Sequence, residues 1–239
     1  MIDVLMCLYD YYWDASRRLD WINLSIRSIL NQTFKDFEFI IVSDGATKEA
    51  IDLVKSLAKD DVRIILYERE HKGRASALDF GVSKCSAEFI AFQDGDDIST
   101  NDRLEKQLFR ISIDDKLGCV GCWYYGIDKD GKILTLARTE NPDNLVLSQL
   151  PGTIGTAMYR KKALDEMGSF RFDLAQDYYS FVKLKLLGWK LANANCPLWL
   201  HRVHGGSLTS RQRDKQKEVE RIVFDEVLKS TKTIINLRK

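Results

Sequence analysis

The sequence predicts an α/β fold, in which a mostly parallel sheet is covered by helices on both faces. In the first half of the chain, short apolar runs alternate with segments whose apolar residues recur at helical spacing. Within the apolar runs there is no polar alternation, as expected of parallel strands that are buried on both faces. With 239 residues, of which 45% are hydrophobic, the chain is long enough to bury the core that such a fold requires.

Four strands and three helices are predicted before residue 100. The first helix carries Ile22, Ile26 and Ile29 on one face, and Cys85 with Ser86 ends the third helix. The predicted strands are Ile2–Leu8, Phe37–Val42, Arg63–Tyr67 and Phe89–Phe92. The predicted helices are Leu19–Leu30, Lys48–Lys59 and Ala75–Lys84.

The second half of the chain has longer strands and fewer repeats of this pattern. Residues 128–131 resemble the opening of a calcium loop, but Lys132 and Ile133 stand where an acid and a glycine are required, so a hairpin turn is predicted. Gly168 and Gly188 each follow a predicted helix. The elements predicted here are a helix over 101–113, strands over 119–127 and 132–137, and helices over 163–167 and 178–187.

Residues 211–239 are predicted to form a C-terminal amphipathic helix, because apolar residues between 219 and 227 share one face. We expect this helix to pack on its own domain. Two alternatives are a homodimer contact and a peripheral contact with a membrane surface, for which Lys229 and Lys232 would supply positive charge.

Composition excludes several classes of protein. The 36 Lys and Arg residues nearly cancel the 35 Asp and Glu residues, which gives no indication of nucleic-acid binding. Five cysteines without a disulfide framework indicate reduced thiols, and the pair Cys119 and Cys122 lacks the second pair that a zinc site needs. Neither a signal peptide nor an apolar stretch of about 20 residues is visible. The sequence therefore predicts a soluble, cytoplasmic protein, at most peripheral at the inner face of a membrane.

A cluster of carboxylates follows the fourth predicted strand. Asp94, Asp96 and Asp97 occupy three of four positions around Gly95, and repel one another unless a cation lies between them. Oxygen ligands on a tight turn suit Mg²⁺ or Mn²⁺, and so few protein ligands leave room for a substrate phosphate. The alternative is a solvated acidic turn. Because ligands of parallel sheets bind at the carboxyl ends of strands, Tyr9, Asp44 and this cluster are expected to share one site.

Five segments in order resemble the family 2 glycosyltransferases, which have the GT-A fold. Ser43, Ala46 and Gln176 depart from the residues usual in that family, and the QxxRW motif of processive synthases is absent. The segments are SILNQTFKDFE (28–38), VSDGAT (42–47), EFIAFQDGDD (88–97), GSF (168–170) with QDY (176–178), and RVHGGS (202–207). The resemblance implies a three-layer α/β/α sandwich in one domain over residues 1–210, with a nucleotide-binding half (1–98) and an acceptor-binding half (99–210).

The resemblance also implies roles for residues around the nucleotide. Asp44 matches the carboxylate that accepts a hydrogen bond from the base, and Tyr9 matches an aromatic that stacks on it, with a core-capping role as the alternative. Arg74, at a helix start, would attract a diphosphate or nucleotide, unless it is an ordinary surface arginine. Asp94 would face the ribose or a metal-bound water.

Three further roles concern metal and catalysis. Asp96 would be the direct metal ligand, and His204 matches a histidine near the metal or diphosphate, although a hydrogen-bonding role in the core is an alternative. Asp177 would be the general base, with helix capping as its alternative. His71 and His201 receive no role from the resemblance.

The function expected is inverting, metal-dependent transfer of one sugar from a nucleotide-diphosphate sugar, with a UDP-sugar preferred, to a saccharide or glycolipid acceptor. Two alternatives stay open. A catalytically silent homologue that acts as a binding subunit would explain the departures at 43, 46 and 176. A sugar-1-phosphate nucleotidyltransferase would need a glycine-rich loop after the first strand, where residues 9–13 contain no glycine.

Overall fold

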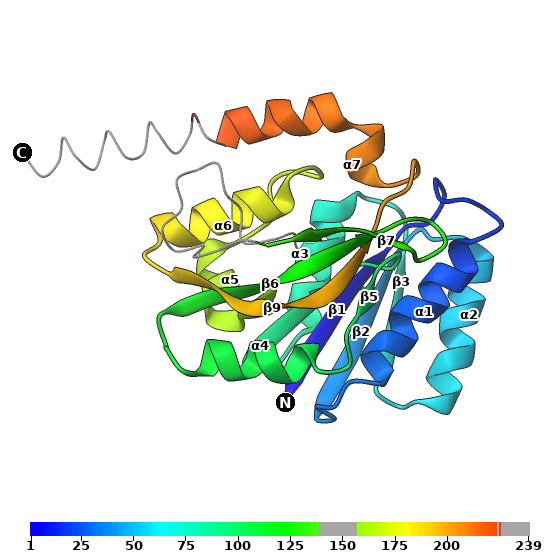
Figure 1. Cartoon of the computed structure of the whole chain (residues 1–239), viewed down its shortest axis with the longest axis horizontal. Helices are drawn as coiled ribbons and strands as arrows, with labels where there is room; N and C mark the ends of the chain where they lie inside the picture. The colour runs from blue at the N-terminus through cyan, green and yellow to red at the C-terminus, as the bar shows by residue number, and fades with distance from the viewer. Residues whose placement is uncertain (139–156, 224, 226–239) are drawn as a thin grey trace, which may run out of the picture.

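A computed structural model of the chain describes residues 1–138, 157–223 and 225. Its first half is a parallel sheet in the order β3-β2-β1-β4 (Figure 1). The register sets Leu8 beside Ser43 and Met6 beside Gln93, so these strands end at the same edge of the sheet. The four strands are β1 (Ile2–Leu8), β2 (Phe37–Asp44), β3 (Ile64–Arg69) and β4 (Phe89–Gln93).

The second half continues the same sheet. The strand order beyond β4 is β8-β6-β9-β5, and β7 pairs with β6 as a hairpin. Strand β8 is antiparallel to both of its neighbours, whereas β6 and β9 are parallel to each other, so the sheet stays mostly parallel as predicted. These strands are β5 (Ile98–Ser99), β6 (Leu117–Ile127), β7 (Ile133–Ala137), β8 (Met158–Arg160) and β9 (Lys190–Arg202).

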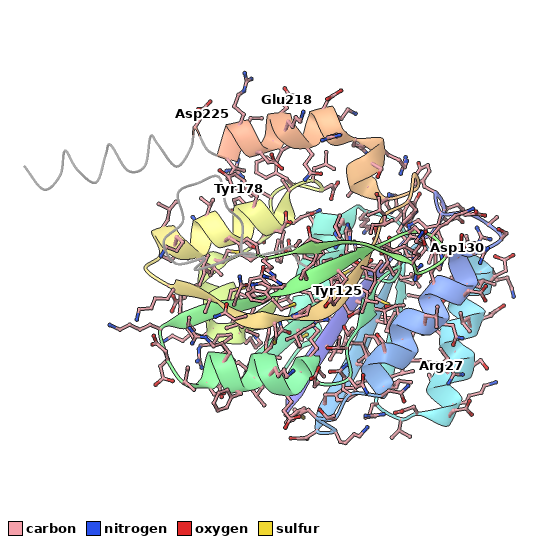
Figure 2. All side chains as sticks on the ribbon, viewed as in Figure 1. Arg27, Tyr125, Asp130, Tyr178, Glu218 and Asp225 are labelled. Atoms are coloured by element: carbon pink, nitrogen blue, oxygen red, sulfur yellow. The ribbon has the colours of Figure 1, made fainter. Side chains whose placement is uncertain are left out.

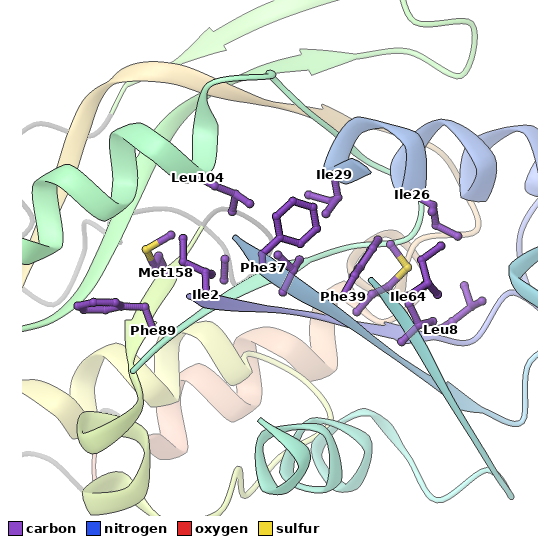
Figure 3. Packing of buried hydrophobic residues seen from close by; sticks show 14 of the residues in the cluster. Ile2, Leu8, Ile26, Ile29, Phe37, Phe39, Ile64, Phe89, Leu104 and Met158 are labelled. Atoms are coloured by element: carbon purple, nitrogen blue, oxygen red, sulfur yellow. The ribbon is translucent and has the colours of Figure 1, made fainter. Parts of the chain in front are cut away.

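Helices cover both faces of the sheet, because successive side chains of a strand point to opposite faces. On β1, Val4 and Met6 belong to the core beneath α1, α2 and α4, part of which Figure 3 shows, whereas Leu5 belongs to the core beneath α3, α5 and α6. The helices of the first face are α1 (Arg18–Leu30), α2 (Lys48–Asp60) and α4 (Arg103–Ser112). Those of the second face are α3 (Arg74–Lys84), α5 (Lys161–Met167) and α6 (Gln176–Leu186).

The glycine turn between β6 and β7 is a hairpin, as predicted. The Gly131 N–H donates to the Asp128 carbonyl at 3.1 Å, and the Asp128 N–H donates to the Lys132 carbonyl at 3.0 Å. Gly131 has φ +90°, a conformation that glycine adopts without strain. Cys119 and Cys122 lie buried on β6, in agreement with the predicted buried strand.

Three strands of the second half were not predicted from the sequence. Strands β5 and β8 have two and three residues, too few for periodicity to be read. Strand β9 is long, but it contains Pro197 and the left-handed residue Asn195, and its register against β6 shifts three times.

The C-terminal segment packs on its own domain over the residues described. One helical turn, α7 (Leu208–Arg211), is followed by a break at Gln212 and a helix over residues 213–223. Val223 of that helix packs against Tyr178 and Val182 of α6, and Figure 2 shows Tyr178 beneath the segment that carries Glu218. Residues 226–239 of the predicted helix lie outside the described residues. Within the described part of the chain, no helix has both the length and the apolar character needed to span a membrane.

Candidate active site

The residues predicted to form a site lie around the carboxyl ends of the parallel strands. Tyr9 follows β1, Asp44 is the last residue of β2, and the acidic turn from Asp94 to Asp97 follows β4. His204 follows β9. This is the edge at which ligands bind in open parallel sheets.

A buried amide holds the acidic turn in shape. The Gln93 side chain donates to the carbonyls of Asp94 and Asp97, at 3.0 and 3.1 Å, and accepts from the buried Arg103 guanidinium at 2.8 Å. Arg103 also donates to the Phe92 carbonyl at 2.5 Å. These bonds fix the backbone of the turn that carries the carboxylates.

Asp96 and His204 meet across the two halves of the sheet. The distance from Asp96 Oδ2 to His204 Nε2 is 2.8 Å, and both side chains are largely buried. Burial raises the pKa of Asp96, but the hydrogen bond and charge of His204 outweigh it, so the pKa lies below its usual value. The His204 ring also lies 4.7 Å from the Trp21 ring, and the Arg202 guanidinium lies over the Trp21 ring at 5.1 Å.

The Asp97 carboxylate makes structural contacts inside the protein. It is buried, its Oδ1 accepts from the Arg202 N–H at 2.6 Å, and its Oδ2 lies 3.3 Å from His201 Nδ1. Burial lowers the pKa of His201, but Asp97 and the other acids of the turn outweigh it and raise that pKa to about 9. The pair therefore ties the end of β9 to the turn after β4, a role for His201 that the sequence did not indicate.

Arg74 is paired with Asp94. One guanidinium nitrogen of Arg74 lies 2.6 Å from Asp94 Oδ1, and the net effect of this partner is to raise the pKa of Arg74 despite burial. At the same helix start, the Ala75 N–H donates to Asp173 Oδ1 at 2.8 Å. Asp173 thus caps α3 from the other half of the chain, a contact between residues 98 positions apart that no local pattern reveals.

Asp44 is almost fully buried beneath a loop that joins β3 to α3. Its carboxylate accepts the N–H groups of Lys72 at 3.1 Å and Gly73 at 3.0 Å, and lies 3.2 Å from Arg69 Nε. His71 Nδ1 is 2.8 Å from Asp44 Oδ2, and the His71 ring stacks on Tyr9 with centroids 4.1 Å apart. Tyr9 and Asp44 are therefore brought together, with His71 between them.

Asp177 is the second residue of α6 and lies near the pair Arg74–Asp94. Burial raises the pKa of its carboxyl to about 6, while the hydrogen bond from the Tyr178 N–H and the charge of Arg74 lower it. The residue before the helix, Ala175, has φ +53°, a left-handed conformation that costs a non-glycine residue about 1 kcal/mol. Strained backbone of this kind is concentrated at functional sites.

The side chains at this site can hold a divalent cation only if substrate or water oxygens complete its coordination shell. Among the residues described, no group of three or more His, Cys, Asp or Glu side chains is arranged to hold a metal ion. Asp96 and His204 are two ligands 2.8 Å apart, which is close to the separation of about 3 Å between adjacent ligands of an octahedral ion. A histidine beside a carboxylate suits Mn²⁺ better than Mg²⁺. The pair would supply part of the coordination shell and leave the rest to water and substrate oxygens.

Comparison with known proteins identifies the family. The family described as Glycosyl transferase family 2 matches residues 4–172. The chain belongs to this family. The match confirms the resemblance inferred from the five segments, and it agrees with the prediction of a glycosyltransferase.

Curated relatives include glycosyltransferases of several kinds. The chain is 38% identical over 141 residues to an uncharacterized glycosyltransferase of Rickettsia bellii, with 59% of this chain and 20% of that protein covered. It is 32% identical over 148 residues to the O-antigen biosynthesis glycosyltransferase WbnJ of Escherichia coli, with 61% and 54% covered. It is 25% identical over 224 residues to a chondroitin synthase of Pasteurella multocida, with 92% and 23% covered. The chain therefore spans a fifth to about half of the length of these relatives.

Solved structures confirm the predicted GT-A fold. A structure of S. aureus TarS 1-349 in complex with UDP-GlcNAc has a TM-score of 0.73 at 18% identity, with 93% of this chain and 65% of that chain covered. The mannosyltransferase PcManGT of Pyrobaculum calidifontis, in complex with GDP-Man and Mn²⁺, has a TM-score of 0.66 at 18% identity, with 84% and 56% covered.

Proposed function

We propose that this chain transfers one sugar from a UDP-sugar to a hydroxyl of a saccharide or glycolipid, with inversion at the anomeric carbon. The observation that carries the proposal is the convergence of four groups at one edge of the sheet: the pair Asp96–His204, the pair Arg74–Asp94, Asp177 and the aromatic Tyr9. Of the neighbours with bound ligands, one carries UDP-GlcNAc and another carries GDP-Man with Mn²⁺. UDP is preferred because Asp44 suits the N3–H donor of uracil, and a stronger response to GDP would overturn this choice.

The donor would lie with its nucleotide toward Tyr9 and Asp44 and its diphosphate toward the acidic turn. Asp96 and His204 would hold Mn²⁺ or Mg²⁺, which would neutralise the charge of the departing nucleoside diphosphate. Arg74 would add a positive charge for the same phosphates, and Asp94 holds its guanidinium at 2.6 Å.

Asp177 would act as the base on the acceptor. A sugar hydroxyl is too weak an acid to ionise unaided, so the Asp177 carboxylate takes its proton as the oxygen attacks the anomeric carbon. The bond from that carbon to the diphosphate breaks as the new glycosidic bond forms. A single displacement on the face opposite the leaving group inverts the configuration.

A transfer assay tests the proposal. The chain is incubated with Mn²⁺ and a panel of UDP- and GDP-sugars, and release of nucleoside diphosphate is measured with and without saccharide acceptors. Release of nucleoside diphosphate that depends on a saccharide acceptor and on Mn²⁺ supports transfer. Binding of a sugar nucleotide without turnover supports the silent homologue. Formation of a nucleotide sugar and pyrophosphate from UTP and a sugar 1-phosphate supports the nucleotidyltransferase.

A further inference from the structure

The His71 side chain occupies the position that the proposed function assigns to the nucleobase. The two groups assigned to the base are the face of Tyr9 and the carboxylate of Asp44. The His71 ring lies on that face, with centroids 4.1 Å apart and ring planes 18° from parallel. The same ring brings Nδ1 to 2.8 Å from Asp44 Oδ2 and to 3.1 Å from the Asp44 carbonyl oxygen.

These two contacts are the ones that a uracil would make. Imidazole is a flat ring with an N–H at its edge, as is the base, so it stacks and donates in the same way. Asp44 is almost fully buried because the loop that carries His71, together with Arg69, covers it. A base therefore cannot contact this face of Tyr9 together with Asp44 Oδ2 while His71 stays in place.

The backbone of the loop and the His71 side chain are held by separate contacts. A Cβ at Gly45 would lie 3.1 Å from the His71 backbone nitrogen, so the two backbones are in close contact. The N–H groups of Lys72 and Gly73 are bonded to Asp44. The His71 side chain is half exposed, with 51% of its surface accessible to solvent. Rotation about its side-chain bonds moves the ring without disturbing these backbone contacts.

We infer that His71 is an internal occupant of the nucleobase site, which the base of the donor displaces when it binds. This inference rests on the proposed function, since it takes the site of Tyr9 and Asp44 as the place of the base. Because the His71 ring must first move away, the affinity for every nucleotide is multiplied by the fraction of molecules in which the nucleobase site is free. A base that makes both contacts of the imidazole, stacking and an N–H donor, replaces the contacts that the displaced ring loses, whereas a ligand that offers a diphosphate alone leaves the ring in place.

Calorimetric titration of UDP in the presence of Mn²⁺ tests the inference on the full chain. His71→Ala removes the ring and keeps the backbone bonds of the loop. It should therefore bind UDP about threefold to thirtyfold more tightly than the unmodified protein, the range expected for one stacked ring and one partly exposed contact with a carboxylate. His71→Phe keeps a ring that can stack but has no donor for Asp44, so its affinity should lie between the two. Unchanged or weaker binding of UDP by His71→Ala would overturn the inference, because His71 would then be a wall of the site or unrelated to it.

The proton spectrum of the three histidines gives a second readout that does not depend on affinity. The Hε1 resonance of His71 is assigned by its absence from the spectrum of His71→Ala. Addition of UDP and Mg²⁺, which is diamagnetic and leaves the resonances sharp, should move it downfield, because the ring leaves the shielding face of Tyr9. An upfield movement would mean that the base stacks on His71, and would contradict displacement. If no nucleoside diphosphate binds either protein, the nucleotide site itself is wrong, and the proposed function fails together with the inference.

Discussion

At the scale of single residues, Asp177 has two properties that a helix-capping aspartate does not need. Its pKa is raised to about 6, mainly by burial, and it lies within electrostatic reach of Arg74 and Asp94. It also accepts the Tyr178 N–H at 2.8 Å, so it contributes something to the start of α6. Substitution by asparagine separates the two roles, because an amide still accepts that N–H but does not take a proton.

Asp177→Asn should therefore lose transfer by at least a hundredfold, since positioned general-base catalysis contributes about 10²- to 10⁴-fold. Steady-state rates with the best donor measure the loss, and calorimetry should give UDP and Mn²⁺ affinities close to those of the unmodified protein. If the variant retains most of its transfer rate, Asp177 is a cap and the base lies elsewhere.

The pH dependence of transfer follows from the same carboxyl. A base acts only when it is ionised, so kcat/KM should fall about tenfold for each pH unit below about 6 and be level above it. The profile is measured between pH 4.5 and 8 with saturating Mn²⁺. The residual activity of Asp177→Asn should lack this limb, and a limb that persists in the variant would assign it to another group.

Ionisation of Asp177, which activity requires, should lower the stability of the folded protein. The pKa of Asp177 in the folded protein lies above its unfolded value, so folding is penalised by ionisation; the penalty is absent below about pH 4 and complete above about pH 6. Asp177→Asn removes it and should raise the free energy of unfolding by about 1–2 kcal/mol at pH 8, after allowance for partial exposure, with no gain near pH 4. Urea unfolding at the two pH values measures the difference. Equal or lower stability of the variant at pH 8 would contradict the raised pKa.

At the scale of elements, the acidic turn depends on a polar layer between β4 and α4. Arg103 is fully buried and is satisfied by neutral groups, namely the Gln93 and Gln107 side chains, the Ser99 hydroxyl and the Phe92 carbonyl. Gln93 alone of the two amides also reaches the carbonyls of Asp94 and Asp97. Gln107 instead donates to the Val120 carbonyl on β6.

Gln93→Met and Gln107→Met form a matched pair that tests this layer. Each leaves the buried Arg103 short of an acceptor and should lower the free energy of unfolding by about 2–4 kcal/mol. Only Gln93→Met should also weaken Mn²⁺ binding in the presence of UDP, because only it releases the backbone of the turn. Denaturant unfolding and calorimetry measure the two effects. Equal metal affinity in both variants would show that the turn keeps its shape without Gln93.

The elements also explain how far the sequence could be interpreted. Strands β1 to β4 were predicted because each contains a short apolar run that is followed by a periodic helix. Strand β9 was not, since Lys190, Asn193, Asn195 and Pro197 give it no period, and its place is fixed by pairing with β6. The same limit applies to the site. Asp44 ends β2 and Asp96 lies in the turn after β4, so both were predicted from the local sequence, whereas the contact of His71 with Asp44 joins residues far apart in the chain.

At the scale of the whole molecule, the site joins the two halves of the sheet. Asp96 comes from the turn after β4 and His204 from the segment after β9, 108 residues later. Asp173 reaches back to cap α3, and Asp97 binds the Arg202 N–H. A ligand that engages both halves therefore adds to contacts that the fold already makes between them.

Mn²⁺ and UDP should consequently bind with positive coupling. The pair Asp96–His204 offers two ligands, so the protein alone leaves most of the coordination sphere to water and should bind Mn²⁺ weakly. A diphosphate supplies further oxygens, so UDP should tighten Mn²⁺ by about five- to a hundredfold, and Mn²⁺ should tighten UDP by the same factor, as linkage requires. Calorimetric titrations of each ligand with and without the other measure both factors.

Asp96→Ala and His204→Ala should abolish the coupling. Asp52 is an exposed carboxylate on α2, so Asp52→Asn should leave the coupling unchanged. Equal affinities for Mn²⁺ with and without UDP, or coupling that survives the loss of Asp96, would remove the metal from this site.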